Sequence, residues 1–314
     1  MARRREKKQR DGLGVALMWG LLGLVSRFPL GFHLRMFRVV SWFLEKILHY
    51  RRDELMINLS RSFPDKKYKE LKQIRHRAYV HMGDLMAGAV RFSRYRGRKG
   101  PERFRRHPQA EVRNPELLGE LFANSPSVMV LTGHAGNWEL IPAIPEMIAS
   151  RGGEWRLSPE ELVIVYKQLS SRLWDRLIYR NRTAILGPGY DGLQETNRIL
   201  RYALEHRDER RVYVFPTDQF PYRGATRHDV GSFMHQPTKA MVGGAAIAAK
   251  FGMSVVYIRW TAVRRGYYAL EFVPITADAS KMTPVEIMQA FYRNLQEDLE
   301  REPENYLWTH KRWK

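Results

Sequence analysis

The sequence predicts an α/β protein with a largely parallel central sheet flanked by helices, preceded by a hydrophobic and amphipathic helical segment that anchors it to a membrane. Two observations lead to this prediction. Apolar, β-branched runs alternate with helical patterns in the C-terminal part of the chain, and an uncharged apolar run stands near the N-terminus. With 314 residues, 44% of them hydrophobic, the chain can bury a sizeable core. We divide it into residues 1–60, a basic membrane-associated helical segment, and residues 61–314, a globular domain.

The N-terminal segment begins with the basic stretch RRREKKQR (Arg3–Arg10) and continues as the apolar run GLGVALMWGLLGLV (Gly12–Val25). A helix that crosses a bilayer needs about 20 apolar residues, so this run is short for a full crossing. Secretory signals also place a basic stretch before an apolar run, but no small-x-small cleavage pattern follows at residues 26–28. We therefore expect a retained anchor, monotopic or half-inserted, with both ends in the cytoplasm.

An amphipathic helical pattern follows between Arg35 and Arg52. Its polar positions recur every three or four residues, at Arg35, Arg38, Ser41, Glu45, His49 and Arg52, and apolar side chains fill the other side. One interpretation is an interfacial helix with Trp42 and Tyr50 near the lipid headgroups. The alternative is a helix packed on the globular domain, and the pattern favours neither.

The globular domain is expected to start with a helix over Tyr68–Phe92, followed by the basic connector SRYRGRKGPERFRRHP (93–108). The predicted strands are Ser127–Thr132, Glu161–Tyr166, Thr183–Gly187, Arg211–Pro216, Met253–Trp260 and Tyr267–Ile275. Helical patterns lie between most of them, after Asn137 and at Ser171–Tyr179, Leu193–His206, Lys239–Phe251 and Pro284–Arg301. This alternation predicts a parallel sheet covered on both faces. The last two strands, joined by TAVRRG, are expected to form an antiparallel hairpin.

Composition limits the chemistry. The chain has no cysteine, which excludes thiol nucleophiles, disulfides and thiolate metal sites. Its 53 Lys and Arg residues against 33 Asp and Glu residues give a formal charge of +20, which favours anionic partners such as anionic lipid, phosphorylated substrates, acidic proteins or nucleic acid. We expect neither a metal nor a cofactor, because no His-Glu-x-x-His motif is present and His76 and His81 stand five residues apart, off one helical face.

The segment GPGYDG (Gly187–Gly192) has the spacing of a dinucleotide-binding fingerprint. Pro188 removes an amide donor from the supposed phosphate cradle, and Asp191 adds a negative charge beside it. No clean strand that ends in an acidic residue follows about 20 positions later, where the ribose contact would require one. We therefore interpret the segment as a turn between a strand and a helix.

The strongest chemical signal is the stretch LTGHAGNWEL (Leu131–Leu140). His134 follows a predicted strand by two residues, at the strand end where ligands bind in open α/β sheets. The glycines on either side permit a tight turn and leave room beside the ring. Asn137 is a good N-cap, which puts Glu139 in the first turn of the expected helix. From there Glu139 can reach one imidazole nitrogen and leave the other free to accept a proton, as in a catalytic dyad. The alternative is a helix-capping loop with an incidental histidine.

The hexapeptide HAGNWE in this stretch resembles the signature of the bacterial lipid A biosynthesis (lauroyl/myristoyl) acyltransferases of the lysophospholipid-acyltransferase superfamily, a histidine and an acidic residue separated by four residues. Further segments resemble the family in the same order: YRRDELMINLSRSFP (50–64), VYKQLSSRLWDRLIYRNR (165–182), TDQFP (217–221), RRGYY (264–268) and WTHKRWK (308–314). Together they cover residues 50–314. The chain departs from the family at Phe233, where members often have two phenylalanines, and at Lys167, where many have arginine.

The resemblance implies an acyltransferase in which His134 is the general base that deprotonates an acceptor hydroxyl and Glu139 orients it. The hydroxyl attacks an acyl thioester, and no covalent enzyme intermediate is needed, in agreement with the absence of cysteine. Lys167, in the family's basic position, would contact an acceptor phosphate or the oxyanion. Arg176 and Arg180, at i and i+4 of a helix, would bind an anion or form a solvated basic face.

The remaining substrate-binding candidates are Asn137, Asp218 and Gln219. Asp218 and Gln219 stand at the end of a predicted strand, where they would position the acceptor, brace the site or form a strand-capping turn. The resemblance also implies the partners: acyl carrier protein or acyl-CoA as donor, a phosphorylated glycolipid as acceptor, and an anionic membrane surface. Residues 61–314 then form the acyltransferase domain, at the cytoplasmic face of the inner membrane.

Two alternative functions stay open. The same chemistry on another lipid acceptor, such as an aminolipid or a lysophospholipid, fits the same residues. A non-catalytic basic protein would instead bind membranes or nucleic acid through the arginine clusters near Arg94 and Arg103. We expect no nucleic-acid partner, because a basic binding surface does not call for a glycine-bracketed His/Glu pair.

Overall fold

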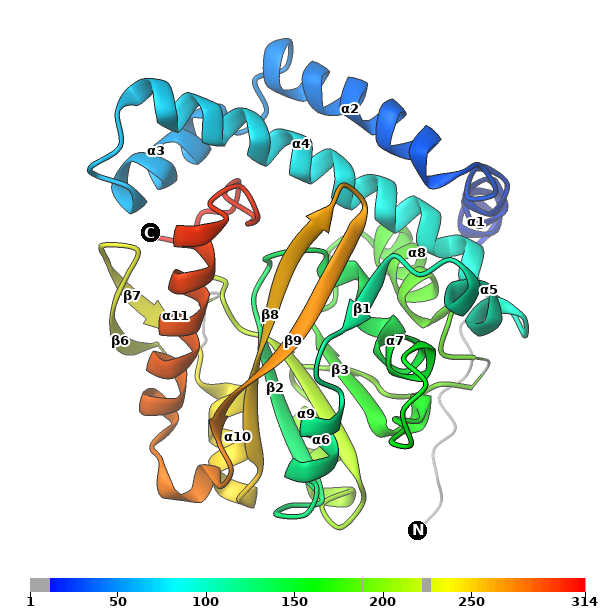
Figure 1. Cartoon of the computed structure of the whole chain (residues 1–314), viewed down its shortest axis with the longest axis vertical. Coiled ribbons are helices and arrows are strands. Elements are labelled where there is room, and N and C mark those ends of the chain that lie inside the picture. The colour runs from blue at the N-terminus through cyan, green and yellow to red at the C-terminus, as the bar shows by residue number, and fades with distance from the viewer. Residues whose placement is uncertain (1–11, 188, 222–226, 314) are drawn as a thin grey trace.

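A seven-stranded sheet runs through the centre of the computed structural model, which describes residues 12–187, 189–221 and 227–313 (Figure 1). The strand order is β1-β9-β8-β2-β5-β3-β4, and every neighbouring pair is parallel except the hairpin β8–β9. The strands are β1 (Ala110–Val112), β2 (Ser127–Thr132), β3 (Leu162–Tyr166), β4 (Leu193–Glu195), β5 (Arg211–Pro216), β8 (Ser254–Arg264) and β9 (Tyr267–Thr276), with β6 (His228–Phe233) and β7 (Gln236–Ala240) as a separate antiparallel pair. The predicted mixed α/β class and the antiparallel final hairpin are confirmed.

Helices cover both faces of the sheet and its upper edge in Figure 1. The α-helices are α1 (Leu13–Val25), α2 (Leu30–Lys46), α3 (Arg52–Ser62), α4 (Tyr68–Phe92), α5 (Gly100–Arg106), α6 (Glu116–Leu121), α7 (Ile144–Ser150), α8 (Arg172–Thr183), α9 (Ile199–Glu205), α10 (Gly243–Phe251) and α11 (Pro284–Arg301). Short 3₁₀ helices are η1 (Ser93–Tyr95), η2 (Trp138–Ala143), η3 (Pro159–Glu161) and η4 (Ala279–Lys281).

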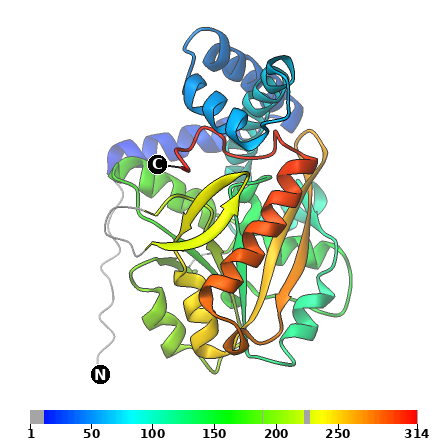
Figure 2. The same cartoon turned by 90° about the vertical axis from the view of Figure 1, so that its left-hand side faces the viewer.

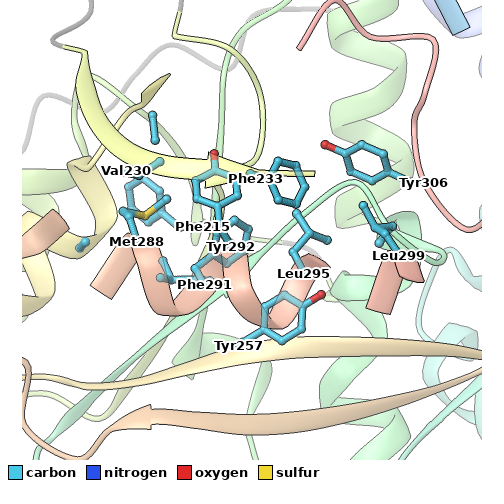
Figure 3. Packing of buried hydrophobic residues seen from close by; sticks show 14 of the residues in the cluster. Phe215, Val230, Phe233, Tyr257, Met288, Phe291, Tyr292, Leu295, Leu299 and Tyr306 are labelled. Atoms are coloured by element: carbon cyan, nitrogen blue, oxygen red, sulfur yellow. The ribbon is translucent and has the colours of Figure 1, made fainter. Parts of the chain in front are cut away.

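The sheet separates two hydrophobic cores, because successive side chains of a strand point to opposite faces. In β2, Met129 and Leu131 join one core while Val128 and Val130 join the other. The first core includes the packed face of α11, where Phe291 and Leu295 lie against Tyr257 of β8 (Figure 3). All six residues of β2 are buried, as expected for a central strand covered on both sides.

The long helix α4 crosses above the carboxyl ends of the parallel strands, and α2 packs along its outer side (Figures 1 and 2). Two of the polar positions of α2 face inward: Ser41 and Glu45 are buried, and the Glu45 carboxylate accepts a hydrogen bond from His76 of α4 at 2.7 Å. Trp42 and Phe43 are exposed instead. The sequence pattern therefore identified an amphipathic helix, but the expected orientation of its polar side is wrong at Ser41 and Glu45. The helix also ends at Lys46, so Arg52 belongs to α3.

Several other predicted elements need correction. The predicted strand Thr183–Gly187 is not one, because α8 runs to Thr183 and buried Ile185 and Leu186 follow in a turn. The helical pattern Leu193–His206 divides into β4 and α9. The turn predicted at Gly187–Gly192 connects α8 with β4, and Pro188 in it lies outside the described residues, as does the basic stretch Arg3–Arg10.

Among the described residues, no single helix is long and apolar enough to span a membrane. Helices α1 and α2 meet such a criterion only as a pair, and a bend of 116° separates them.

Candidate active site

The candidate site lies where two neighbouring parallel strands end. Strand β2 pairs with β5, and Thr132 at the end of β2 is opposite Pro216 at the end of β5. His134 follows Thr132 by two residues, and Asp218 follows Pro216 by two. Parallel pairing in this register brings the two side chains to the same point above the sheet.

Asp218 holds His134 through two hydrogen bonds. Its Oδ1 accepts from ring Nδ1 of His134 at 2.7 Å, and its Oδ2 accepts from the backbone N–H of the same residue at 3.0 Å. With the proton on Nδ1, the lone pair of the neutral ring is on Nε2. The side-chain amide Nε2 of Gln219 lies 3.3 Å from that atom and donates to it. The His134 side chain keeps 19% of its surface exposed, so the ring is not sealed in the interior.

Electrostatics in the site favour a charged pair. Burial would lower the pKa of His134, but the charge and the hydrogen bond of Asp218 outweigh burial and raise the pKa above its ordinary value. For Asp218, burial would raise the pKa, but the charge of His134 and its hydrogen bonds lower the pKa to about 2. Asp218 therefore stays ionised at physiological pH and supports a proton on the imidazole.

Glu139 has a different partner from the one predicted. Its Oε2 accepts from Nε of Arg182 at 3.0 Å and its Oε1 accepts from Nη2 of Arg182 at 2.6 Å, a bidentate pair between η2 and α8. Trp138 donates its indole N–H to Oε1 at 3.1 Å. The expected hydrogen bond from His134 to the Glu139 carboxylate is thus wrong in this structure, since the Nδ1–H donates to Asp218. Glu139 acts on the imidazole only through its charge.

The ion pair with Arg182 keeps Glu139 charged. Burial would raise the pKa of Glu139, but the charge and hydrogen bonds of Arg182 lower it below the ordinary value. Burial likewise would lower the pKa of Arg182, and Glu139 raises it. The Trp138 ring that contacts Glu139 also meets the His134 ring edge-on, with centroids 5.1 Å apart. The two charge pairs therefore border one another.

The loop that carries His134 is fixed by the C-terminal segment. Ala135 forms an antiparallel bridge with Tyr306, and the carbonyl of His134 accepts from the backbone N–H of Leu307 at 3.1 Å. Gly136 has a φ of 61°, and a Cβ there would lie 2.2 Å from Cβ of Trp260. Only glycine fits both the backbone conformation and the close approach.

The other predicted site residues differ in how far they are buried. Asn137 stands at the N-cap of η2 and Glu139 in its first turn, as predicted, but the buried Asn137 side chain forms no capping hydrogen bond and packs near Gly88 of α4. Lys167 is exposed just beyond β3. Arg176 and Arg180 are partly buried on α8, where Arg176 lies over Tyr179 and Arg180 stacks on Trp19 of α1, with 4.9 Å to the ring centroid.

A model of the family described as bacterial lipid A biosynthesis acyltransferase matches residues 4–314. The chain belongs to this family. No curated protein matched it. The family carries out acyl transfer in lipid A biosynthesis, and the match extends over the described helices, the sheet and the C-terminal segment, which is nearly the whole chain.

Two segments that carry the family resemblance meet behind the site. Nδ2 of Asn58, in the segment at residues 50–64, donates to the carbonyls of Trp308 and His310 at 2.8 and 2.9 Å. In this acyltransferase Arg182 and Tyr306 were not predicted as site residues from the sequence. Arg182 is the last residue of the family-like segment 165–182, which contains other arginines. Only the packing of α8 on η2, which brings Arg182 to Glu139, distinguishes it from them.

Proposed function

We propose that this family member transfers a fatty acyl group from an acyl thioester to a hydroxyl of a lipid A precursor, with His134 as general base. The observation that carries the proposal is the hydrogen bond of 2.7 Å from Nδ1 of His134 to a buried carboxylate, which leaves Nε2 as the proton acceptor.

The proposed reaction runs in two proton transfers. The acceptor hydroxyl replaces the amide of Gln219 at Nε2 of His134, gives up its proton there, and its oxygen attacks the thioester carbonyl. The tetrahedral oxyanion collapses, the carbon–sulfur bond breaks, and the imidazolium returns the proton to the thiolate. Asp218 remains ionised and stabilises the imidazolium. Glu139 forms an ion pair with Arg182 in place of the predicted hydrogen bond with His134. Its negative charge still favours the imidazolium form of His134.

Lys167, Arg176, Arg180 and Gln219 remain the proposed contacts to the acceptor or to the oxyanion. The donor in this proposal is acyl carrier protein or acyl-CoA, and the formal charge of +20 suits both an acidic carrier protein and a phosphorylated glycolipid. Residues 1–60 are proposed to associate with the membrane and residues 61–314 to catalyse, although residue 60 falls inside α3, whose Leu55 and Leu59 join the core.

Membrane association at the cytoplasmic face of the inner membrane is part of the proposal. Leu13, Leu17, Leu21 and Leu24 form one exposed stripe along α1, with between 58% and 77% of each residue accessible. On α2, the apolar side chains of Trp42 and Phe43 are exposed as well, and so are the basic side chains of Arg35 and Arg38. A surface of this kind fits the interface of an anionic bilayer better than water.

The experiment that tests the function identifies the acceptor. Purified protein is incubated with a labelled acyl thioester, either acyl carrier protein or CoA linked, and a mixture of lipid A precursor, aminolipid and lysophospholipid, and products are read by lipid mass spectrometry. The proposal expects the lipid A precursor to gain one acyl mass with wild type and not with His134→Ala. A gain on another lipid alone would establish the alternative acceptor, and no gain with any lipid would contradict the proposal.

A further inference from the structure

A cavity that His134 does not line lies between the start of α2, the end of α4 and the tip of the β8–β9 hairpin. Its volume is about 390 Å³, within the usual range for small-molecule sites. None of the residues discussed for acyl transfer lines it. The lining includes Arg91, Tyr95, Arg106, Gln109, Arg264 and Tyr267.

The floor of this cavity contains buried polar groups that are poorly compensated. Arg91 is only 8% exposed and donates to the backbone carbonyls of Ser26 and Phe28 at 2.7 and 2.9 Å, and no carboxylate of the described residues pairs with it. Gln109 is 2% exposed, and within the same part of the chain neither its Oε1 nor its Nε2 has a hydrogen-bond partner. A buried guanidinium without a counter-charge is costly, so a ligand that brings negative oxygens would be stabilised here.

The rim adds further positive charge. Arg106 and Arg264 are exposed at the mouth of the cavity. Two carboxylates contact lining residues: Glu102 accepts from Arg106 at 2.5 Å, and Glu111 accepts from the hydroxyl of Tyr267 at 3.0 Å. The pair with Glu102 is solvent-exposed and therefore weak, so Arg106 can turn to a stronger anionic partner.

The position of the cavity indicates the source of the anion. Arg91 donates hydrogen bonds to the segment between α1 and α2. Phe28 in this segment and Phe32 at the start of α2 are 50% and 44% exposed, and Leu30 between them lines the cavity. An apolar surface that enters the bilayer at this turn would bring lipid headgroups to the level of the arginines.

We propose that this cavity binds the phosphate of an anionic membrane phospholipid that is not itself acylated. The proposal rests on the membrane contact proposed above. The bound headgroup would fix the orientation of the enzyme on the membrane while the acceptor reacts at His134. Guanidinium groups recognise phosphate through paired hydrogen bonds, and the unpartnered side-chain amide of Gln109 supplies a neutral donor beneath them.

The test measures binding of a monomeric short-chain phosphatidylglycerol by isothermal titration calorimetry, below the concentration at which it forms micelles. The variant Arg106→Gln/Arg264→Gln removes two rim charges and leaves Arg91 to hold the α1–α2 turn. The control Arg35→Gln/Arg38→Gln removes the same charge from exposed positions on α2 outside the cavity. Thermal unfolding of both variants checks folding. We expect the cavity variant to bind roughly tenfold more weakly for each arginine removed, and the control and His134→Ala to bind as wild type does.

Other results would overturn the proposal. Equal losses in the two double variants would mean general charge attraction and no site. Displacement of the lipid by millimolar inorganic phosphate would assign the cavity to free phosphate. Because the assay contains no thioester, its result is independent of whether the protein transfers acyl groups.

Discussion

Asp218 contacts His134 through both carboxylate oxygens, and this arrangement has a consequence for pH dependence. The pKa of His134 is lowered by burial and raised by Asp218, with a net rise. A general base works only when it is neutral, so kcat/KM should increase with pH as His134 loses its proton. Removing the negative charge removes the contribution that raises the pKa.

The first prediction concerns this residue pair. In Asp218→Asn the rise of kcat/KM should move to lower pH than in wild type, because the neutral amide no longer favours the imidazolium. The plateau should fall by about 10²–10⁴-fold, because the ring loses its orientation and its charge stabilisation. The pH profile of acyl transfer measures both effects.

Glu139→Gln is the matched control for Asp218→Asn. The charge of Glu139 raises the pKa of His134 and that of Arg182 lowers it, so removing Glu139 also leaves Arg182 unopposed. We expect a shift in the same direction, without loss of the Nδ1 hydrogen bond. If Glu139→Gln reproduced the whole plateau loss while Asp218→Asn did not, Asp218 would not be the orienting residue.

A second prediction at this scale concerns Gly136. Gly136→Ala combines a φ of 61° with a clash against Trp260, so it should lower the free energy of unfolding by about 3 kcal/mol or more. Gly152→Ala is the control, since Gly152 has a φ of 80° but no atom within 4 Å of an added Cβ, and it should cost about 1–2 kcal/mol. Urea unfolding compares them; equal costs would contradict the role of the Trp260 contact.

At the scale of elements, hydrophobic pattern predicted the strands that carry the site but not their order. Strands β2 and β5 were predicted with their observed bounds, and both His134 and Asp218 stood two residues beyond a strand end. The sequence does not encode in any local pattern that β5 pairs with β2, so the nearer carboxylate, Glu139, was paired with His134 instead. The prediction relied on the short sequence spacing between His134 and Glu139, whereas the observed partner, Asp218, is 84 residues away in the sequence.

The missed elements have physical reasons too. Strands β1 and β4 have three residues each, too short for a period of two to be recognised. The pair β6–β7 turns at Met234 and His235, which have positive φ without being glycine, so no turn signal marks it. In α2, Glu45 can be buried because His76 of α4 forms a hydrogen bond with it. The hydrophobic pattern of α2 alone gives no information about this partner on another helix.

A prediction at the same scale concerns α1. Leu17→Ser/Leu21→Ser should weaken binding to phosphatidylglycerol-containing vesicles by about tenfold for each leucine, since each buries apolar surface in the bilayer. Leu200→Ser/Leu204→Ser on α9 is the matched control, because these residues have similar spacing and are 47% and 50% exposed. Vesicle co-sedimentation measures the difference, and the same loss in both double variants would argue against α1 as the membrane contact.

At the scale of the whole molecule, distant segments of the chain support the His134 loop. Asn58 on α3 donates hydrogen bonds to the C-terminal segment, and Tyr306 in that segment forms an antiparallel β-bridge with Ala135, next to His134. Two of the segments that carry the family resemblance, residues 50–64 and 308–314, are thus far apart in the sequence and in contact in the structure. Their order in the sequence predicted the family, and their contact is a property of the fold.

The corresponding prediction is for Asn58→Ala. One buried and one partly buried carbonyl lose their donor, so we expect the free energy of unfolding to fall by about 1–3 kcal/mol and acyl transfer to fall with it. Ser60→Ala, on the exposed side of the same helix, should change stability by less than about 0.5 kcal/mol. Denaturant unfolding and activity at one temperature test both variants. Unchanged activity in a destabilised Asn58→Ala would show that the C-terminal segment does not position the loop.

The most direct test of the account is the single-turnover rate of acyl transfer by wild type and His134→Asn, with donor and acceptor both saturating. If Nε2 of His134 takes the proton of the acceptor hydroxyl, the rate should fall by about 10²–10⁴-fold while donor binding and thermal unfolding stay close to wild type. A folded His134→Asn protein that transfers the acyl group within a few-fold of the wild-type rate would contradict it.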